Sequence, residues 1–465
     1  MTSSPATRTE HDAIGPYEVP ADAYYGIDTK RAVDNFPVSG ILMPLDFIRA
    51  HTIVKRSAAL ANKDLGLVSP ERADAIVQAA DEVLDGKFDD QFVVEVFQTG
   101  SGTSTNMNVN EVLANRANEI LGGGPKGHYD PVHPNDHVNR GQSSNDTIPT
   151  SLHLSVIIAI EKKLIPVLEK LEATLRAKAT EFDGVVKTGR THLMDATPIR
   201  LGQEFLGYAG QIDRGRRRVS SAADALREVA LGGTAVGTGV NTHPEFAART
   251  LKCVSEYTGV EVRETSNHFQ AQSTIDAAVE ASGELKTLAI SLIKIANDIR
   301  IMGSGPRAGL YELAIPALQP GSSIMPGKVN PVIPEAVVQV AAQVIGNDAT
   351  VSAAGQWGFF ELNTMLPVAG FNMLQSVEIL ANVSKLLDEK CVAGLQATEN
   401  GPRMVEHGLS IATPLANVIG YDKTAELANK AFATRKSIRE VAREETGLSE
   451  EELDKILDAR KMTGS

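Results

Sequence analysis

Cysteine is scarce in this sequence, and long apolar runs are missing. The 465 residues include only two cysteines, Cys253 and Cys391, which are too few for a disulfide framework and lack the paired spacing of a zinc site. The first fifteen residues, MTSSPATRTEHDAIG, contain no apolar stretch, so we expect no secretory signal. No run reaches the length of a membrane span, so we expect no membrane partner. These absences favour a reducing compartment and a cytoplasmic protein.

Basic residues are in deficit. The chain has 45 Lys and Arg against 58 Asp and Glu, a formal charge of -13, which argues against nucleic acid as a partner. A small anionic ligand would therefore need its own local cluster of cations and N–H donors. Hydrophobic content of 42% and charged content of 22% are typical of globular proteins. The length predicts more than one core or one very extended core.

Strand patterns are sparse, whereas helical periodicity is long. In residues 151–182, apolar side chains recur at steps of three and four residues and predict one helix face: Ile157, Ile160, Leu164, Leu168, Leu171 and Leu175. Pro166 should kink this helix without ending it. Similar patterns over about 199–229, 270–302, 335–347 and 370–390 predict a mainly α protein built as an elongated helix bundle.

Changes in pattern along the chain predict three domains. Residues 1–141 are more broken by Pro and Gly, and we expect a mixed, mostly helical N-terminal domain there. Residues 142–398 carry the long helical patterns of the central bundle. Residues 399–465 contain short charged segments such as TAELANKAF and SEEELDKILDARK, which predict a small helical C-terminal domain.

Four polar loops lie at or beside the start of a predicted helix. They are TGSGTSTN (99–106), QSSNDTIP (142–149), GRTHLMDATP (189–198) and GSSIMPGKVNP (321–331). Helix N-termini expose unpaired N–H groups and partial positive charge, so they suit carboxylates. For any single loop, helix capping by Ser, Thr and Asn is the simpler explanation. Four such loops, with one lysine and one histidine among them, favour an anion site.

The distance between two of these loops predicts an oligomer. A single helix over 151–182, at about 1.5 Å per residue, would separate QSSND from GRTH by roughly 45 to 50 Å. The two loops could share a site within one subunit only if the helix folded back. Neighbouring subunits would otherwise complete the site, which predicts a symmetric oligomer packed through long helices.

The motifs of these loops resemble those of class II fumarases, within the fumarase/aspartase superfamily. The resemblance also includes HPNDHVNRGQSSND and GGTAVGTGVNTHP, and it extends from RTEHDAIG to the C-terminal RKMTGS. It implies a three-domain, mostly helical homotetramer around a twenty-helix core, with each site built from three subunits. It also implies reversible, cofactor-free hydration of fumarate to L-malate, so a small dicarboxylate is the expected substrate.

The resemblance assigns roles to individual residues. Ser322, preferred over Ser323 on the family match alone, would be the catalytic base. His192, with Glu335 as its charge partner, would handle the departing water, and Lys328 and Asn330 would bind a carboxylate. Hydrogen bonds to the substrate carboxylates would come from Ser101, Thr103, Ser143, Ser144, Asn145 and Thr191.

Two further motifs need separate interpretation. His133, Asn135 and Asp136 match a second dicarboxylate site of the family, and we expect no metal there because Pro134 interrupts the turn between His133 and His137. The glycines of GGGPKG formally fit the dinucleotide pattern GxGxxG. A helical segment precedes them where a strand is required, so we predict a loop.

Aspartase, which adds ammonia to fumarate, is the main alternative. Aspartases tend to carry Gly-Ala-Gly-Thr and Ser-Thr-Asn where this chain has GSGT and SSN, and often Gln in place of His192. These three positions favour fumarase. AYYGIDTKRAVDNF (23–36) and GPRAGL (305–310) look more like aspartase but lie outside the substrate motifs. A non-catalytic scaffold is a third hypothesis, against which the full set of catalytic-type residues argues.

Overall fold

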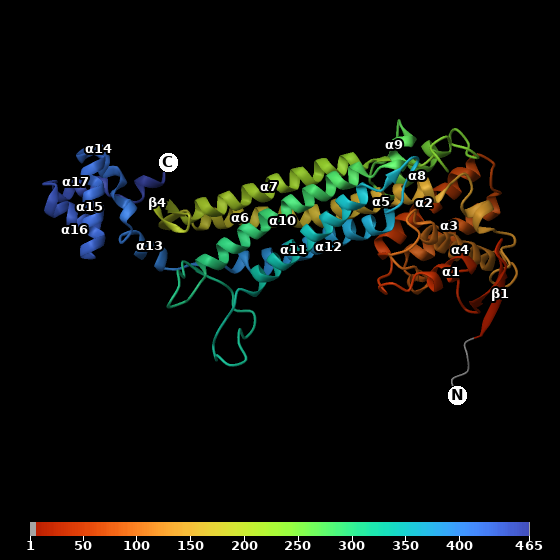
Figure 1. Ribbon diagram of the computed structural model, residues 1–465, viewed down its shortest axis with the longest axis horizontal. Coiled ribbons are helices and arrows are strands. Elements are labelled where there is room, and N and C mark those ends of the chain that lie inside the picture. Colours follow the sequence, from red (N-terminus) through yellow and green to blue (C-terminus); the bar gives the residue numbers. More distant parts are fainter. Residues whose placement is uncertain (1–5, 465) are drawn as a thin grey trace. The chain divides into compact units, whose positions relative to one another are not determined.

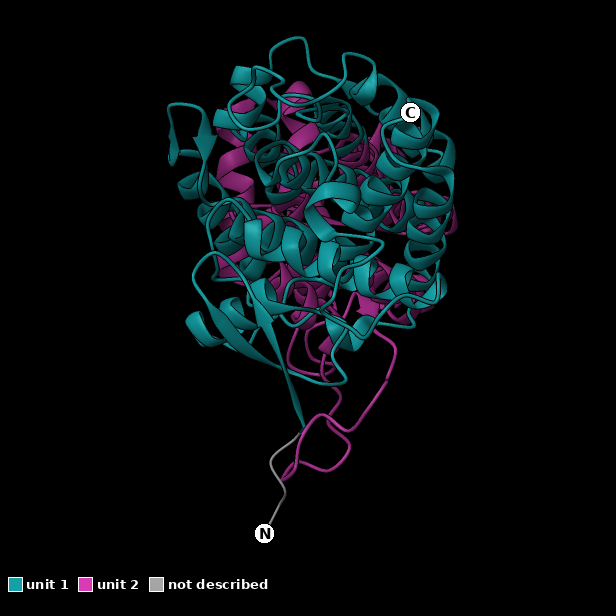
Figure 2. Ribbon diagram, turned by 90° about the vertical axis from the view of Figure 1, so that its right-hand side faces the viewer, with its two compact units in different colours: residues 1–166, 217–287, 342–380 teal, residues 167–216, 288–341, 381–465 magenta. Residues whose placement is uncertain are grey.

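The computed structural model describes residues 6–464, most of which lie in helices (Figure 1). Contacts group the chain into two compact units (Figure 2). Unit 1 comprises residues 1–166, 217–287 and 342–380, and unit 2 comprises 167–216, 288–341 and 381–465. The boundaries fall within the long helices, so each unit contains several separate chain segments. The division into domains 1–141, 142–398 and 399–465 stays a prediction.

Unit 1 is centred on α2. This helix, Leu45–Asp64, packs against helices from four other parts of the unit. Those helices are α3 (Pro70–Leu84), α4 (Thr103–Ile120), α5 (Ser144–Ala159) and α8 (Phe246–Thr258). Their core contains large side chains that are fully buried, among them Phe47, Ile76, Leu113, Leu152 and Phe246. Because α2 contacts both α4 and α5, it can fix the positions of their N-termini.

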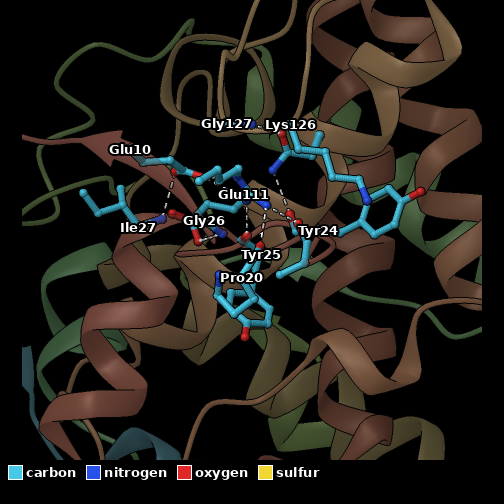
Figure 3. A network of polar contacts seen from close by, with 12 residues as sticks. Glu10, Pro20, Tyr24, Tyr25, Gly26, Ile27, Glu111, Lys126 and Gly127 are labelled. Atoms are coloured by element: carbon cyan, nitrogen blue, oxygen red, sulfur yellow. Dashed lines mark hydrogen bonds and ion pairs between the residues drawn. The ribbon is translucent and has the colours of Figure 1, made fainter. Parts of the chain in front are cut away.

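The N-terminus of α1 (Ile27–Asn35) is held by two buried carboxylates (Figure 3). Glu111 accepts hydrogen bonds from the backbone N–H of Gly26 at 2.8 Å and from the hydroxyl of Thr29 at 2.6 Å, and Glu10 accepts one from the N–H of Ile27 at 3.0 Å. A Cβ atom at Gly26 would lie 2.0 Å from the Tyr129 hydroxyl oxygen. The stretch YYGIDT therefore has a structural role as a carboxylate-capped helix start.

The predicted bundle helices are confirmed. They are α6 (Ile165–Glu181), α7 (Leu201–Leu226), α10 (Asp276–Met302), α11 (Val332–Gly355) and α12 (Leu366–Lys390). Within unit 2, Tyr208 of α7 donates to Asp298 of α10 at 3.0 Å. Within unit 1, Ser282 of α10 donates to Asp348 of α11 at 2.8 Å. The long helices therefore run side by side in each unit.

The helix predicted over 151–182 is interrupted, which corrects the expectation of a simple kink. A π-helical turn, Ile160–Leu164, separates α5 from α6, and Pro166 is the second residue of α6. Proline has no N–H to donate and its ring needs room, so the wider turn that precedes it accommodates both effects. Residue 270, predicted to start a long helix, lies instead in the short helix α9 (His268–Ser273), before α10 begins.

The strands are short and pair in twos. The longer pairs are β1 (Thr7–His11) with β2 (Pro16–Pro20), and β3 (Val186–Thr191) with β4 (Met194–Arg200), both antiparallel. The others have two residues each: β5 (Glu228–Val229), β6 (Arg263–Glu264), β7 (Leu313–Ala314), β8 (Gly358–Phe359), β9 (Leu362–Asn363) and β10 (Gln396–Ala397). The sparse strand signal of the sequence is therefore confirmed.

The last part of the chain has its own apolar core. It consists of α13 (Asn400–Val405), α14 (Ala416–Ile419), α15 (Tyr421–Thr434), α16 (Ile438–Glu445) and α17 (Glu450–Ile456). Ile411 and Leu415 of a 3-10 helix, Leu409–Leu415, are buried together with Leu427, Val441 and Leu453 of α15, α16 and α17. The two charged segments predicted as helices are α15 and α17. No helix within residues 6–464 has the length and apolar character needed to cross a membrane.

Candidate functional site

Hydroxyl groups join the N-termini of α4 and α5 in unit 1. Thr103 is the first residue of α4, and Ser144 is the first residue of α5. The Thr103 hydroxyl shares one hydrogen bond of 2.7 Å with Ser101 and another of 2.7 Å with Ser144. Three of the predicted carboxylate-binding residues are thus in contact at two helix N-termini, the end of a helix that favours anions.

Ser143 and Asp146 form the cap that starts α5. The Ser143 hydroxyl accepts from the N–H of Asn145 at 3.2 Å, and Asp146 accepts from the N–H of Ser143 at 2.9 Å. Asp146 also accepts from the N–H groups of Gly232 at 3.1 Å and Thr234 at 2.9 Å. Burial raises the pKa of Asp146, and these backbone hydrogen bonds oppose the shift. One carboxylate therefore connects the SSN motif to the GGTAV motif.

Asn145 is oriented by the same segment. Its side-chain nitrogen donates to the Ala235 carbonyl at 2.8 Å, which fixes the orientation of the amide. The segment 232–234 reaches this position through unusual backbone angles, with φ of 106° at Gly232 and 53° at Thr234. Glycine adopts such an angle without strain, which explains Gly232; Gly233 is explained by space, because a Cβ atom there would lie 2.0 Å from the side-chain oxygen of Gln272.

The GRTH motif is a β-hairpin, which corrects its prediction as a loop leading into a helix. The two residues between β3 and β4 are His192 and Leu193, with φ of 55° and 62°. Positive φ at both positions is the geometry of a two-residue hairpin turn. Helix α7 begins only at Leu201, so neither Thr191 nor His192 lies at a helix N-terminus. The His192 side chain is exposed at the hairpin tip.

Strand β3 of this hairpin carries two cations that form ion pairs with the buried Glu312. Arg190 donates to the two oxygens of Glu312 at 3.0 and 2.8 Å. The Lys187 ammonium lies 3.2 Å from Glu312 and 2.9 Å from Glu204. Burial raises the pKa of Glu204, while Lys187 opposes the shift. The sequence prediction missed this group because its members come from three separate segments.

The GSSIMPGKVNP loop is closed by its own backbone. The N–H of Gly321 donates to the Lys328 carbonyl at 2.6 Å, and the Asn330 side chain donates to the Gly321 carbonyl at 2.7 Å. Residues including Ser322, Met325 and Lys328 line a hollow of about 440 Å³. The loop leads into α11, whose first turn contains Glu335. Ser322 and Lys328 therefore line one hollow, in the loop that precedes the N-terminus of α11.

Two backbone N–H groups donate hydrogen bonds to Ser322. Its hydroxyl oxygen accepts from the N–H of Met325 at 2.9 Å and from the N–H of Ile324 at 3.2 Å. Hydrogen bonds donated to an oxygen favour its deprotonated form. Between residues 6 and 464, no hydrogen bond or ion pair links Ser322 or Lys328 to His192 or Glu335. The roles assigned to these four residues stay predictions.

The predicted second site is a capped turn. His133 Nδ1 accepts from the N–H of Asn135 at 3.2 Å and lies 3.6 Å from a carboxylate oxygen of Asp136. His137 Nδ1 accepts from the His133 N–H at 2.8 Å. Pro134 begins a single π-helical turn, Pro134–Val138. In the described part of the chain, no group of three or more His, Cys, Asp or Glu side chains could hold a metal ion.

The glycine-rich segment GGGPKG is a loop after α4, as predicted. The N–H of Gly127 donates to the Asn115 side chain at 2.8 Å. Since a helix precedes the glycines in place of a strand, the arrangement of a dinucleotide-binding motif is not present at these residues.

Known proteins resemble the chain along nearly its whole length. Residues 15–346 match the Lyase family and residues 411–464 match the fumarase C C-terminus. A fumarate hydratase class II from Halobacterium salinarum is 56% identical over 98% of this chain and 97% of its own length. The chain belongs to the class II fumarase family. Another member, from Neisseria meningitidis, is 51% identical over 97% of this chain and 98% of its own.

Solved structures agree with this assignment. The class II fumarase from Schistosoma mansoni has a TM-score of 0.96 and 38% identity, and the match covers 98% of this chain and 99% of that one. A fumarate lyase:delta crystallin from Brucella melitensis, bound to cobalt, has a TM-score of 0.95 and 44% identity, and the match covers 99% and 100%. The mainly α fold of the fumarase/aspartase superfamily is therefore confirmed, as is the resemblance to class II fumarases.

Proposed function

We propose that this chain catalyses the reversible hydration of fumarate to L-malate. The observation that carries the proposal is the 56% identity to a fumarate hydratase class II over 98% of the chain. The contact between Ser101, Thr103 and Ser144 at two helix N-termini supports it, because a dicarboxylate needs hydroxyl and N–H donors. The activity is that of a hydro-lyase, and we propose that it needs no cofactor.

The reaction has two difficult steps that the protein must assist, the removal of a proton and the departure of hydroxide. When malate is the starting compound, a poorly acidic proton beside a carboxylate must be removed, and hydroxide must leave the neighbouring carbon. The negative charge can spread into the carboxylate as an aci-carboxylate dianion, which preorganised donors and positive charge would stabilise. An acidic protein with a formal charge of -13 must supply that positive charge locally.

Ser322 is our proposed base. A neutral serine is a weak base, so its alkoxide must be stabilised before it can take a proton. The N–H groups of Ile324 and Met325 support this role, because both donate to the Ser322 oxygen. Lys328 and Asn330 would bind the carboxylate that receives the charge. His192, with Glu335, would protonate the departing hydroxide, since imidazole both gives and takes protons near neutral pH.

Hydrogen bonds would hold the second carboxylate of the substrate, the one that Lys328 and Asn330 do not bind. The donors we propose are Ser101, Thr103, Ser143, Ser144, Asn145 and Thr191. Ser144 and Thr103 support this assignment through their position in the first turns of α5 and α4. Hydroxyl and amide donors bind the carboxylate in the substrate and in the transition state alike, so they would contribute mainly to substrate affinity.

We also propose a homotetramer in which each site takes residues from three subunits. The helical run predicted between QSSND and GRTH supports it, since one subunit would need to fold back to join them. Sedimentation velocity tests the tetramer, and mixing two inactive variants with changes in different motifs tests the shared sites by recovery of activity. His133, Asn135 and Asp136 remain our proposal for a second dicarboxylate site, and the cytoplasm remains our proposal for the compartment.

The test of function is a fumarate assay with and without ammonium. Loss of fumarate absorbance without ammonium, with malate as the product, is the expected result. Aspartate formed only with ammonium would support aspartase instead, and an inert protein would support the scaffold hypothesis.

A further inference from the structure

Lys55 of α2 is a fully buried lysine whose ammonium faces a turn. Its exposed fraction is 0%, and it donates hydrogen bonds to the side-chain oxygens of Asn139 at 2.8 Å and Gln142 at 3.0 Å. No ion pair with a carboxylate is found for it in the described part of the chain. A buried cation without a carboxylate partner is costly, so its contacts need an explanation.

The turn from Asn139 to Gln142 directly precedes Ser143, Ser144 and Asn145. The N–H of Gln142 donates to the Asn139 carbonyl at 3.0 Å and closes this turn. Asn62, two helical turns after Lys55 on α2, donates to the Arg140 carbonyl at 3.0 Å. Residues seven apart share one helix face, so one face of α2 holds the turn at two points.

Asn139 also connects the turn to α4. Its side-chain oxygen accepts from the amides of Asn106 and Asn110, both at 3.3 Å, in addition to Lys55. Asn106 lies one helical turn after Thr103, the first residue of α4. Through a single amide oxygen, Lys55 is therefore linked to the starts of both helices that carry the proposed carboxylate-binding hydroxyls.

The arrangement does not maximise stability. The side-chain oxygens of Asn62 and Asn110 are buried without a hydrogen-bond partner within the described residues. Each such atom costs free energy, as does burial of the cation. Features that cost stability persist where they position a functional group. Both the ammonium and the neutral amine have enough N–H donors for the two bonds to the turn.

We propose that Lys55 is a positioning residue for substrate binding. By fixing the turn from Asn139 to Gln142, it holds Ser143, Ser144 and Asn145 where they meet a substrate carboxylate. This inference rests on the proposed function. Because those residues would bind the carboxylate in substrate and transition state alike, loss of Lys55 raises KM more than it lowers kcat.

The test compares Lys55→Met with a buried control on the same helix. Methionine has a similar length and no donor, and we expect the KM for fumarate to rise about tenfold with kcat within about threefold. Thr52→Val is the control, because the Thr52 hydroxyl is buried and, among the described residues, bonds only to the Ile48 carbonyl of its own helix, at 2.8 Å. We expect a wild-type KM for this variant.

Gln142→Leu provides a second variant at a half-buried position, in case Lys55→Met does not assemble. It removes one acceptor of Lys55, and we expect KM to rise about threefold or more. Gln142→Leu also removes two bonds that the Gln142 amide donates, to the carbonyls of Val138 and Arg140. The double variant should therefore have a KM at or somewhat above that of Lys55→Met but below the product of the two single effects, because the contact between the two side chains is lost only once. A double variant whose two effects multiply would show independent roles and overturn the inference.

Two further results would overturn it. One is a wild-type KM in Lys55→Met; the other is a lower kcat at unchanged KM, which indicates only a smaller amount of folded enzyme. Wild-type turnover is measured first, so that the proposed function is tested separately. If the wild type does not consume fumarate, the proposed function fails; if it does, the KM of Lys55→Met decides the role of Lys55.

Discussion

Arg190 and Glu312 form a two-point ion pair beneath the hairpin that carries His192. The guanidinium donates to both carboxylate oxygens, at 3.0 and 2.8 Å, and Glu312 is 1% exposed. Glu312 also faces the buried Lys187 ammonium at 3.2 Å. Glu312 therefore pairs with two cations of β3, of which Lys187 also pairs with Glu204. Arg190 directly precedes Thr191 and His192 in the chain.

Glu312→Gln should destabilise unit 2. The change leaves two buried cations with one fewer carboxylate, and loss of one partner of a buried pair costs about 3–5 kcal/mol. A lower denaturation midpoint and a reduced kcat are the expected results, measured by urea titration and by fumarate turnover. Glu245→Gln, which alters the exposed pair with Arg249, is the control and should leave both quantities unchanged. Equal midpoints for Glu312→Gln and the wild type would contradict the role of Glu312.

Ser322→Ala should lower kcat about a thousandfold, since it removes the proposed base while binding groups remain. Sedimentation velocity should give the same assembly as for the wild type, which separates catalysis from folding. The control is Ser323→Ala, the neighbouring serine, for which we expect wild-type turnover. If Ser323→Ala were the inactive variant, the base would be assigned to the wrong serine.

Lys328→Met should cost at least about 100-fold in kcat/KM, comparable to the loss of an oxyanion donor. The lysine side chain is exposed in the loop between Gly321 and Asn330, so the change should not affect the unfolding midpoint. Steady-state kinetics with fumarate measure the effect. A loss smaller than tenfold would show that Lys328 does not stabilise the developing charge.

The charge of Lys55 should make stability depend on pH. Burial lowers the pKa of Lys55 from 10.5 to about 7, and attraction by Asp146 opposes the shift. Between these values the unfolded chain binds a proton that the folded chain does not. The free energy of unfolding should therefore rise with pH across this window, by up to about 1.4 kcal/mol per pH unit.

Lys55→Met lacks this contribution. Urea titrations of both proteins from pH 6 to 9.5 should show that the wild type gains stability over the variant above about pH 7, with a constant difference below it. His51, the other titratable group beside Lys55 on α2, has its pKa lowered by burial and by Lys55, so it stays neutral in this range. Parallel curves for the two proteins would show that Lys55 does not titrate in this window.

Gly26→Ala tests whether the aspartase-like stretch has a structural role. The new Cβ would meet the Tyr129 hydroxyl at 2.0 Å and the carboxylates of Glu10 and Glu111, so we expect a loss of about 3 kcal/mol of unfolding free energy. The remaining activity should still yield malate. The control is Gly184→Ala, where a Cβ would meet nothing within 4 Å. Aspartate formation by either protein would contradict this reading of residues 23–36.

Apolar periodicity predicted the long helices well and the hairpin badly. α7, α10, α11 and α12 follow from repeats of three and four residues that continue over several turns. The strands of the GRTH hairpin are short and contain polar residues and Pro198, so they have little strand signal. Its turn places His192 and Leu193 at positive φ. A turn of this kind is usually recognised from Asn and Gly at these two positions, and neither is present here.

Some residues of the candidate site could be predicted from sequence, and others could not. The positions of Ser101, Thr103 and Ser144 at or beside helix starts could be predicted from sequence, because Ser and Thr precede the helix patterns there. Their mutual contacts come from the packing of α4 against α5, and their role in binding a carboxylate stays a prediction. Lys55 could not be found, since its partners Asn139 and Gln142 lie 84 and 87 residues away along the chain. The sequence offered one indication of this buried network, namely His51 and Lys55, four residues apart among the apolar residues of α2. Such polar pairs indicate a buried network only once the packing of the helix is known.

Identification of the reaction product tests the proposed hydration of fumarate. Purified wild-type protein and Ser322→Ala are each incubated with fumarate, without ammonium, and the products are identified by NMR spectroscopy. We predict L-malate from the wild type and unchanged fumarate from Ser322→Ala. Unchanged fumarate in both samples would contradict the proposed hydration, and malate formed equally by both would contradict Ser322 as the base.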